Sequence, residues 1–345
     1  MNIVVLAGGL SPERDVSFSS GTMACNALLN MGHHAVMIDL FFGLPDWDGT
    51  DSIFLQAKPL APYQITESEP DLAAIRASRS CGYNDYIGTN VIELCTRADI
   101  VYMALHGDCG ENGKLQALFD SFGIRYTGSG SKACERAMDK WVSKAIFQEA
   151  GLLCPFGIRL AQNDPVPYDS IPYPCVVKPL CGGSSIGVSI VNSPDHLRAA
   201  LDAAFAVEPI ILIEQYIKGR ELSCAVLGNS ALPVIEIIPK EGFYDYKNKY
   251  QAGSTIEITP AHLDPATTEQ IQKLALSGFH ALGLQVYGRL DFLLTEDGKA
   301  YCLEANTLPG LTPTSLLPQE AAAAGIDYHS LCKMIIELSL EKSNG

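Results

Sequence analysis

Residues 176–190 read VVKPLCGGSSIGVSI, and the interpretation of this stretch decides the fold of the chain. Two apolar runs flank a tip that holds two glycines and two serines, and Lys178 stands at the end of the first run. A hairpin turn needs only about two residues, so this tip is longer than a turn requires. Backbone N–H groups in a glycine-rich tip can surround phosphate oxygens. On the loop alone, a plain flexible hairpin is the better interpretation.

The composition limits the classes of protein that the chain can be. Its 345 residues are 47% hydrophobic, which indicates two or three domains with sizeable cores. A net charge of −15 argues against nucleic-acid or anionic-membrane partners, and no uninterrupted apolar run is long enough to cross a bilayer. The opening MNIVVLAGG lacks the pattern of a targeting leader. Eleven cysteines without a CxxC pair indicate reduced thiols in a cytoplasmic protein.

The first third of the chain has the pattern of an open parallel sheet. NIVVLAG, a helix that ends at Gly32, and HHAVMIDL form a predicted βαβ start, and ADIVYMALHG adds a third strand. Residues 42–93 are rich in Pro, Gly, Asp and Tyr and are interpreted as an insertion of undetermined role, with a helical piece near DLAAIRAS. The first domain is therefore expected to span residues 1–128.

Two further α/β units are expected. Residues 129–217 begin with one long helical run, SKACERAMDKWVSKAIFQEAG, and continue into the hairpin, the helix DHLRAALDAAFA and the strand PIILIEQYIKG. Residues 218–345 begin with the strands ELSCAVLG and LPVIEIIP, contain a polar, tyrosine-rich loop EGFYDYKNKYQAG, and end with an amphipathic helix. Between them lie a helix ending at Gly283 and a strand pair joined by an EDG turn.

This last strand pair carries a candidate metal site. Glu304 and Asn306 are two apart on one strand and face the same side, and hairpin pairing brings Asp291 beside them. Two carboxylates and an amide oxygen suit Mg²⁺, which takes its remaining ligands from water and phosphates. A solvated strand face is the alternative, but the apolar flanks favour the metal.

With Lys178 and Lys140 nearby, this acidic set makes a nucleoside triphosphate the better interpretation of the glycine-rich tip. The tip lacks GxxxxGK[ST], so it is not a Walker A loop, and the first turn, GGLSPERDVS, lacks GxGxxG, so a dinucleotide fold is not supported.

Eight sequence motifs occur in a characteristic order along the chain. They are GGLSPERDVSFSSG, ALHGDCGENGKLQALF, YTGSGSKACERAMDK, VVKPLCGGSSIGVS, EQYIKGREL, FYDYKNKY, GRLDFL and LEANTLPGLTPTSLLP. Together they resemble the ATP-grasp enzymes, and among these the D-alanine–D-alanine ligases, over the whole chain except residues 42–93. The resemblance implies an α/β, three-domain ATP-grasp fold with an N-terminal open parallel, Rossmann-like sheet.

The resemblance also implies roles for individual residues. For ATP, it implies phosphate contacts by Lys140, Lys178, Gly183, Ser184, Ser185 and Lys249, adenine contacts by Glu214, Gln215 and Ile217, and a ribose contact by Glu221. For two Mg²⁺ (or Mn²⁺) ions, it implies the ligands Asp291, Glu304 and Asn306. For D-alanine, it implies an ammonium site at Glu13 linked to Ser184 and Tyr250, oxyanion donors at Arg289 and Gly310, and substrate contacts by His106 and Ser315.

The implied activity is ATP-dependent joining of two D-alanine molecules for peptidoglycan synthesis, by a cytoplasmic homodimer. Two departures from the family pattern are Leu180-Cys181-Gly182, where we expect no carboxylate to accompany the loop, and Pro313-Thr314 before Ser315. The alternatives are a ligase for D-serine or D-lactate and a non-catalytic nucleotide-binding regulator. Tyr250 argues against D-lactate, SLLP favours D-alanine over D-serine, and an intact Arg289 argues against a regulator, although Arg289 can also be a structural ion pair.

Overall fold

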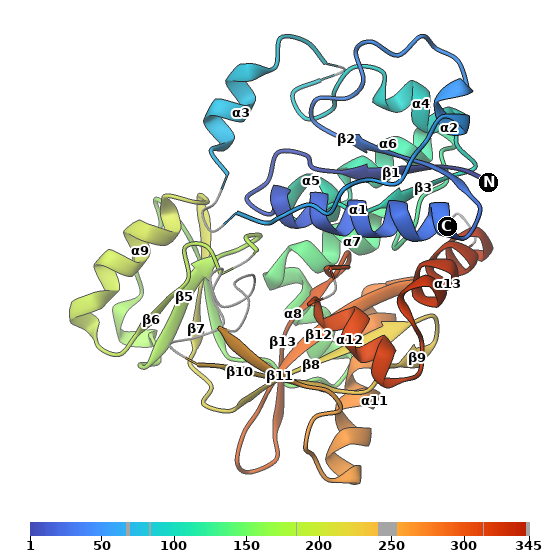
Figure 1. Ribbon diagram of the computed structural model, residues 1–345. Coiled ribbons are helices and arrows are strands. Elements are labelled where there is room, and N and C mark those ends of the chain that lie inside the picture. Colours follow the sequence, from blue (N-terminus) through green and yellow to red (C-terminus); the bar gives the residue numbers. More distant parts are fainter. Residues whose placement is uncertain (67–69, 83, 184, 241–253, 313, 343–345) are drawn as a thin grey trace.

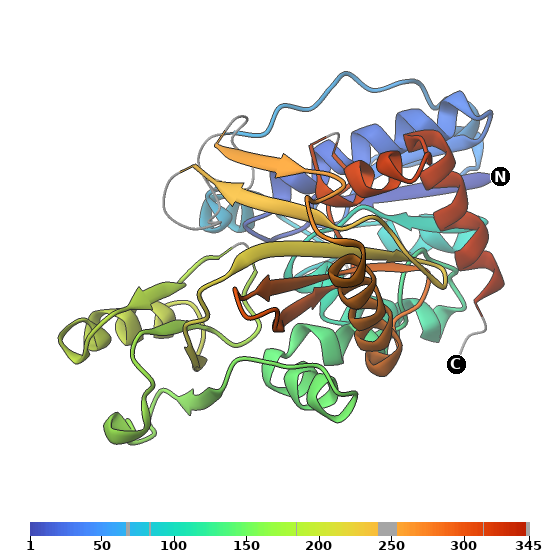
Figure 2. The same ribbon diagram turned by 90° about the horizontal axis from the view of Figure 1, so that it is seen from below.

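The chain folds into three α/β units that surround a central site (Figures 1 and 2). This computed structural model describes residues 1–66, 70–82, 84–183, 185–240, 254–312 and 314–342. Among these residues, no helix has both the length and the apolar content needed to cross a membrane.

The first unit is built on a parallel sheet with the strand order β2-β1-β3. Its strands are β1 (Asn2–Ala7), β2 (His34–Asp39) and β3 (Ile100–Met103). Its helices are α1 (Arg14–Asn30), α4 (Val91–Arg97), α5 (Asp108–Glu111) and α6 (Lys114–Phe122). Residues 3–7 of β1 are fully buried, as expected for a continuous apolar run at the centre of a parallel sheet. The predicted open parallel sheet is confirmed.

Residues 42–93, for which an insertion stays a prediction, have little regular structure of their own. They contain the short helices α2 (Ser52–Leu55) and α3 (Leu72–Ser78), the second of which was expected from DLAAIRAS. Residues 57–66, which follow α2, run along α1 as an extended segment, as both ribbon views show (Figures 1 and 2).

The long helical run expected at residues 131–151 is two helices, so this expectation is corrected. They are α7 (Ser131–Met138) and α8 (Lys140–Glu149). Asp139 separates them with an extended backbone (φ −81°, ψ 102°), and its carboxylate accepts hydrogen bonds from the N–H groups of Trp141 (2.9 Å) and Val142 (3.0 Å). A side-chain cap of this kind starts a new helix, which leaves Lys140 at its first position.

The second unit is a four-stranded antiparallel sheet with the order β4-β7-β5-β6, covered by one helix. Its strands are β4 (Gly157–Ala161), β5 (Cys175–Pro179), β6 (Ser189–Val191) and β7 (Ile210–Gln215). Its helices are α9 (Leu197–Phe205) and the 3₁₀ turns η1 (Tyr168–Ser170) and η2 (Pro194–His196). Strands β5 and β6 form the predicted hairpin.

The third unit is an antiparallel sheet with the order β11-β10-β8-β12-β13, to which β9 adds by pairing with β8. The strands are β8 (Arg220–Leu227), β9 (Ser230–Ala231), β10 (Ile235–Pro239), β11 (Thr255–Ile258), β12 (Tyr287–Leu294) and β13 (Ala300–Asn306). The helices are α11 (Pro265–Leu282), α12 (Leu316–Ala323) and α13 (Tyr328–Glu341). Helices α7 and α8 share the apolar core of this unit rather than that of the second. The domain boundary near residues 128–131 stays a prediction.

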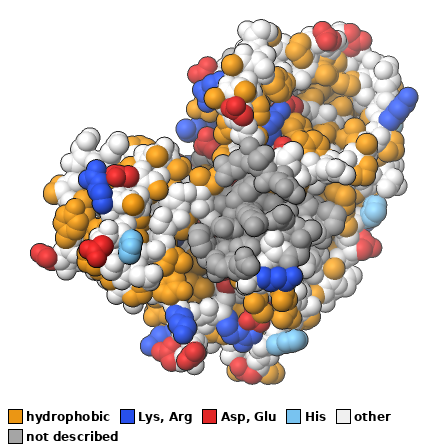
Figure 3. All heavy atoms as spheres, turned by 60° about the vertical axis from the view of Figure 1, so that its left-hand side comes forward, with side chains coloured by type: hydrophobic (Ala, Val, Ile, Leu, Met, Phe, Trp, Pro, Cys, Tyr) orange, Lys and Arg blue, Asp and Glu red, His pale blue; other side chains and the backbone are white. Residues whose placement is uncertain are grey.

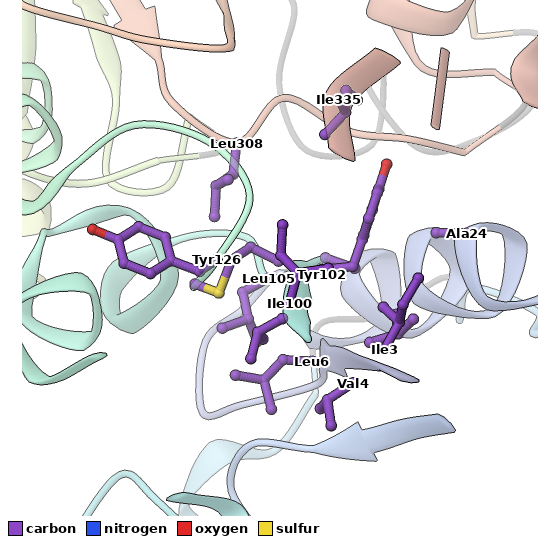
Figure 4. Packing of buried hydrophobic residues seen from close by; sticks show 14 of the residues in the cluster. Ile3, Val4, Leu6, Ala24, Ile100, Tyr102, Leu105, Tyr126, Leu308 and Ile335 are labelled. Atoms are coloured by element: carbon purple, nitrogen blue, oxygen red, sulfur yellow. The ribbon is translucent and has the colours of Figure 1, made fainter. Parts of the chain in front are cut away.

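The last helix joins the third unit to the first. Ile335 of α13 lies in the same apolar cluster as Ile3, Ala24 and Tyr102 of the first unit, and Figure 4 shows it on the side of the cluster toward Tyr102. Because Leu308 belongs to this cluster too, the loop after β13 is held against the first unit. This packing places the ends of β1, β3 and β13 around one central site.

Candidate active site

The predicted hairpin of acidic residues is present and sits at the centre of the molecule. Strands β12 and β13 pair antiparallel, with Asp291 opposite Glu304 and Arg289 opposite Asn306. The register shifts after Asp291, a bulge that alters the direction of the strand beside the two carboxylates. The geometry expected from the side-chain spacing is therefore confirmed.

Asp291 is held by hydrogen bonds on all sides. Its carboxylate accepts two from the guanidinium of Arg289 (both 2.9 Å), one from the Asn306 amide (2.9 Å) and one from the Ser223 hydroxyl (2.6 Å). Such a shared, two-pronged contact fixes both the carboxylate and the guanidinium. Arg289 thus makes the ion pair that was considered as an alternative, at a position that also lines a cavity.

Lys140 links this acidic set to the glycine-rich loop. Its buried ammonium donates to the Gly182 carbonyl (2.7 Å) and lies 3.2 Å from the Glu304 carboxylate. Burial is the largest single effect and lowers the pKa of Lys140, but the charge and hydrogen bond of Glu304, together with smaller effects of Cys181 and Glu208, raise the pKa above its usual value. Lys140 therefore keeps its positive charge between the glycine-rich loop and the acidic set.

A second buried ion pair lies on the other side of the loop. The Glu214 carboxylate, only 3% exposed, contacts the ammonium of Lys178 (2.8 Å) and that of Lys144. Burial raises the pKa of Glu214, but the two lysines lower it below its usual range. The sequence analysis missed Lys144; its spacing of one helical turn from Lys140 would have placed it on the same face of the helix.

These two clusters line a cavity of about 560 Å³, which is within the usual range for small-molecule sites. Ten predicted site residues are among those that line the cavity: Lys140, Lys178, Gly183, Ser185, Glu214, Gln215, Ile217, Glu221, Asp291 and Glu304. Glu236 also lines it and holds Arg220 through two hydrogen bonds (2.7 and 2.6 Å). In the pairing of β8 with β10, Glu236 lies opposite Leu222, two positions from Arg220 on the same face, which the sequence did not reveal.

The glycine-rich loop does have a carboxylate beside it, contrary to expectation. Glu208, from the segment after α9, accepts a hydrogen bond from the Cys181 N–H (2.9 Å). The expectation considered only the loop's own residues, whereas the carboxylate comes from a distant part of the second unit. Three predicted site residues, Ser184, Lys249 and Tyr250, lie outside the described residues.

A second, smaller cavity of about 100 Å³ lies on the far side of Lys140. Glu13, at the start of α1, enters this cavity from the first unit. Its carboxylate reaches the glycine-rich loop, because a Cβ atom added to Gly183 would lie 3.3 Å from Glu13 Oε2, and one added to Gly107 would lie 3.0 Å away. The first unit and the loop therefore meet at this carboxylate.

His106 connects the first and third units at the same cavity. Burial lowers the pKa of its ring, so the ring is neutral near pH 7. Its Nδ1 lies 2.9 Å from the Leu308 carbonyl and therefore donates, while Nε2 accepts from the Ser20 hydroxyl (2.9 Å). Ser20 in turn accepts from the Leu311 N–H (3.2 Å). This chain determines the tautomer of His106.

Glu111 is a buried carboxylate that the sequence analysis did not single out. It accepts hydrogen bonds from the N–H groups of Gly107 (2.9 Å) and Leu308 (3.0 Å). Burial, reinforced by the charge of Glu13, raises its pKa to about 7. Its place in the GENGK segment gave no sign that Leu308 would cover it.

The loop between β13 and α12 closes the small cavity. Gly310 lies so close to Ser315 that a Cβ atom there would be 2.6 Å from its hydroxyl oxygen, so only glycine fits. The Ser315 hydroxyl accepts from the Thr312 N–H (3.0 Å) and lies 2.7 Å from the Thr312 hydroxyl. The structure thus brings Glu13, His106, Arg289, Gly310 and Ser315 around one space.

Figure 3 shows how the described charged side chains are distributed over one face of the molecule. Basic and acidic side chains are interspersed there among apolar ones, and the described side chains form no broad basic area. This distribution agrees with the net charge of −15.

Comparison with known proteins identifies relatives over the full length. The family described as "D-ala D-ala ligase N-terminus" matches residues 2–129, and "D-ala D-ala ligase C-terminus" matches residues 166–337. A protein of Pediococcus pentosaceus named D-alanine–D-alanine ligase is 43% identical over 343 residues, 97% of each chain. Its namesake from Lacticaseibacillus casei is 41% identical over 99% of this chain and 96% of its own.

Solved structures give the same result. The chain is similar to the crystal structure of a D-alanine–D-alanine ligase from Bacillus anthracis, with a TM-score of 0.76 and 33% identity over 99% of this chain and 97% of the other. A second structure of that protein, described as complexed with ATP, has a TM-score of 0.76 and 32% identity over the same shares.

Proposed function

The chain belongs to the D-alanine–D-alanine ligase family, and on this basis we propose that it joins two D-alanine molecules at the expense of ATP, through an acyl phosphate. The product would serve peptidoglycan synthesis. The two cavities and the residues between them provide the parts that such a reaction needs.

The observation that carries the proposal is the wall that the two cavities share. Lys140, Gly182, Gly183 and Glu304 line both of them. ATP in the large cavity would place its γ-phosphate at this wall, and D-alanine in the small cavity would place its carboxylate on the other side. Positioning of two reactants in this way is the main source of rate in phosphoryl transfer.

In the first step, a carboxylate oxygen of the first D-alanine attacks the γ-phosphorus, and ADP leaves. Lys140 and Lys178 neutralise phosphate charge, and Glu13 holds the ammonium of the first D-alanine. The ion-pair partners of these two lysines, Glu304 for Lys140 and Glu214 for Lys178, hold them in place before ATP binds.

The acidic set fits Mg²⁺. Asp291, Glu304 and Asn306 would supply hard oxygen ligands, and the contacts of the two carboxylates with Arg289 and Lys140 support a site for positive charge. Because Mg²⁺ takes six oxygen ligands, phosphate oxygens and water would complete the coordination. The ions, two in number by our proposal, would neutralise phosphate charge during transfer.

In the second step, the free amine of the second D-alanine attacks the acyl phosphate. The carbonyl oxygen becomes an oxyanion, for which Arg289 and the Gly310 N–H are the donors. The C–O bond then breaks, the nitrogen loses a proton to the leaving phosphate, and phosphate and dipeptide are released. Ser315 would hold the carboxylate of the second D-alanine at the end of the small cavity, where it is fixed by Thr312.

D-Alanine is the preferred second substrate over D-serine or D-lactate, because the relatives reported above share the name D-alanine–D-alanine ligase. A non-catalytic regulator is disfavoured by the same relatives. We further propose that the enzyme is a homodimer, as the family resemblance implies, and that it works in the cytoplasm, as expected from its free cysteines.

The proposal is tested by incubating the purified chain with ATP, Mg²⁺ and D-alanine and measuring phosphate and dipeptide together. We expect equal amounts of the two products, and far slower turnover when D-serine or D-lactate is offered as the second substrate. ATP hydrolysis without dipeptide would contradict the proposal.

A further inference from the structure

The insertion at residues 42–93 is attached to the helix that carries Glu13. The Asp15 carboxylate, in the first turn of α1, accepts hydrogen bonds from the Tyr63 hydroxyl (2.9 Å), the Thr66 N–H (3.2 Å) and the Thr66 hydroxyl (2.6 Å). The Tyr63 ring also packs on Phe18, with the ring centroids 5.2 Å apart. We call residues 60–66 the strap.

The position of Asp15 is buried, and burial of a carboxylate is unfavourable unless the carboxylate has hydrogen-bond partners. Asp15 is only 7% exposed, and three donors to one buried carboxylate replace the water that it has lost. Burial of the Tyr63 hydroxyl, together with its hydrogen bond to Asp15, raises the pKa of Tyr63 to about 12, so the hydroxyl stays a donor.

The opposite flank of the same helical turn is fixed by Arg14. Its guanidinium forms an ion pair with Asp39, at the end of β2, and lies 4.8 Å from the centre of the Phe18 ring. Asp39 also accepts from the Gly9 N–H (3.1 Å). The turn that precedes α1 contains Gly8 and Gly9, so its conformation depends on contacts such as these.

Glu13 links these two attachments to the small cavity, in which the first D-alanine is proposed to bind. It is the residue before α1, one position from Arg14 and two from Asp15. Its side chain enters the small cavity and approaches the glycine-rich loop at Gly183. A rotation of the first turn of α1 would move the Glu13 carboxylate relative to that loop.

We propose that the strap is a positioning element for the first D-alanine site: Tyr63 and Thr66 hold Asp15, and through it set the position of Glu13. This inference rests on the proposed function. It gives the insertion a role in binding the ammonium group of the first substrate, although no strap residue lines the small cavity.

The test compares two places where the strap is tied to the same helix. Tyr63→Phe combined with Thr66→Val removes both side-chain donors to Asp15 while keeping the size of each residue. Asn26→Ala removes the second tie, in which the Asn26 amide bonds the N–H and carbonyl of Leu60 (2.8 and 2.9 Å). Asn26 lies 11 residues beyond Asp15, about 16 Å along the helix, and is the matched control.

The readout is the dependence of dipeptide formation on D-alanine, fitted for two sites, with the KM for ATP measured alongside. We expect the double variant to raise the KM of the first D-alanine site about tenfold, with the second site, the KM for ATP and kcat within about twofold of wild type. Asn26→Ala should leave all four values near wild type. Thr66→Ser, which keeps the hydroxyl, should behave as wild type in an otherwise unchanged chain.

Each contrary outcome is distinct. A wild-type chain that makes no dipeptide overturns the proposed function, and this inference with it. If wild type is active but the double variant matches Asn26→Ala, or weakens both D-alanine sites equally, the strap does not position Glu13. Should the double variant fail to fold, Tyr63→Phe alone, which keeps both Thr66 bonds, must still raise the first-site KM selectively.

Discussion

Glu304 shows how a single side chain at this site has two tasks. Without ligands its carboxylate neutralises the buried Lys140, and in the proposed reaction it would also bind Mg²⁺. We expect Glu304→Gln to lower kcat on the order of a thousandfold, because the loss of one ligand charge costs several kcal/mol in the transition state. Phosphate release at saturating Mg²⁺ measures this effect, and circular dichroism confirms that the variant is folded. A variant that keeps more than about a tenth of the wild-type rate would show that Glu304 is not a metal ligand.

Arg289 pairs with Asp291 in the ligand-free protein but is proposed to act on the oxyanion. We expect Arg289→Met to lower the rate of dipeptide formation by about 10²–10³ while the Kd for ATP changes little, because the donor is needed only in the second step. Nucleotide titration and product analysis separate the two effects. Equal losses in both would mean that Arg289 serves only as a structural ion pair.

Glu111 should make the stability of the protein depend on pH. Its carboxyl titrates near 4.5 when unfolded and near 7 when folded, so between these values the folded protein holds a proton that the unfolded chain releases. Stability from this group is therefore lost as the pH rises through that window, by roughly 3 kcal/mol in total. In Glu111→Gln this dependence is absent.

The measurement is Tm of wild type and of Glu111→Gln from about pH 5 to about pH 8. The difference, wild type minus variant, should fall as the pH rises. Glu320, whose pKa is also raised by burial, remains in both proteins and cancels. A difference that stays constant with pH would show that Glu111 is already ionised in the folded protein.

At the scale of elements, the break between α7 and α8 sets the position of Lys140. We expect Asp139→Ala to remove the cap of α8, lower the free energy of unfolding by about 1 kcal/mol and raise the KM for ATP. Asp264→Ala is the control, because Asp264 caps α11 in the same unit through the N–H groups of Ala266 and Thr267 (both 3.0 Å) but lines neither cavity. Urea denaturation and ATP kinetics should show similar stability losses for both, with a change in KM for Asp139→Ala alone.

Strand elements were more predictable than this helix boundary. The alternation in GRLDFLL and AYCLEAN is enough to place Asp291, Glu304 and Asn306 on one face, because side chains two apart on a strand must share a side. The run at residues 131–151 reads as one helix, because every residue in it is compatible with a helix. Only the Asp139 cap, which competes with the helical backbone, divides it.

At the scale of the whole molecule, the sequence could not predict contacts between distant segments. Lys144 with Glu214, Glu111 with Leu308, and Glu208 with Cys181 each join residues whose partners depend on how the units pack. The roles of Glu13 and Ser315 came from the family resemblance, since neither stands in a pattern that shows its chemistry. The packing of α13 on the first unit brings both to one cavity.

In the proposed reaction, the carboxylate of one D-alanine takes the γ-phosphoryl group at the wall between the two cavities. The most direct test uses D-alanine labelled with ¹⁸O in its carboxylate, with mass analysis of the released phosphate. The acyl-phosphate route predicts one ¹⁸O atom in each phosphate, because the bridging oxygen comes from the carboxylate and leaves with phosphorus when the amine attacks carbon. Phosphate without label, released together with dipeptide, would contradict the account.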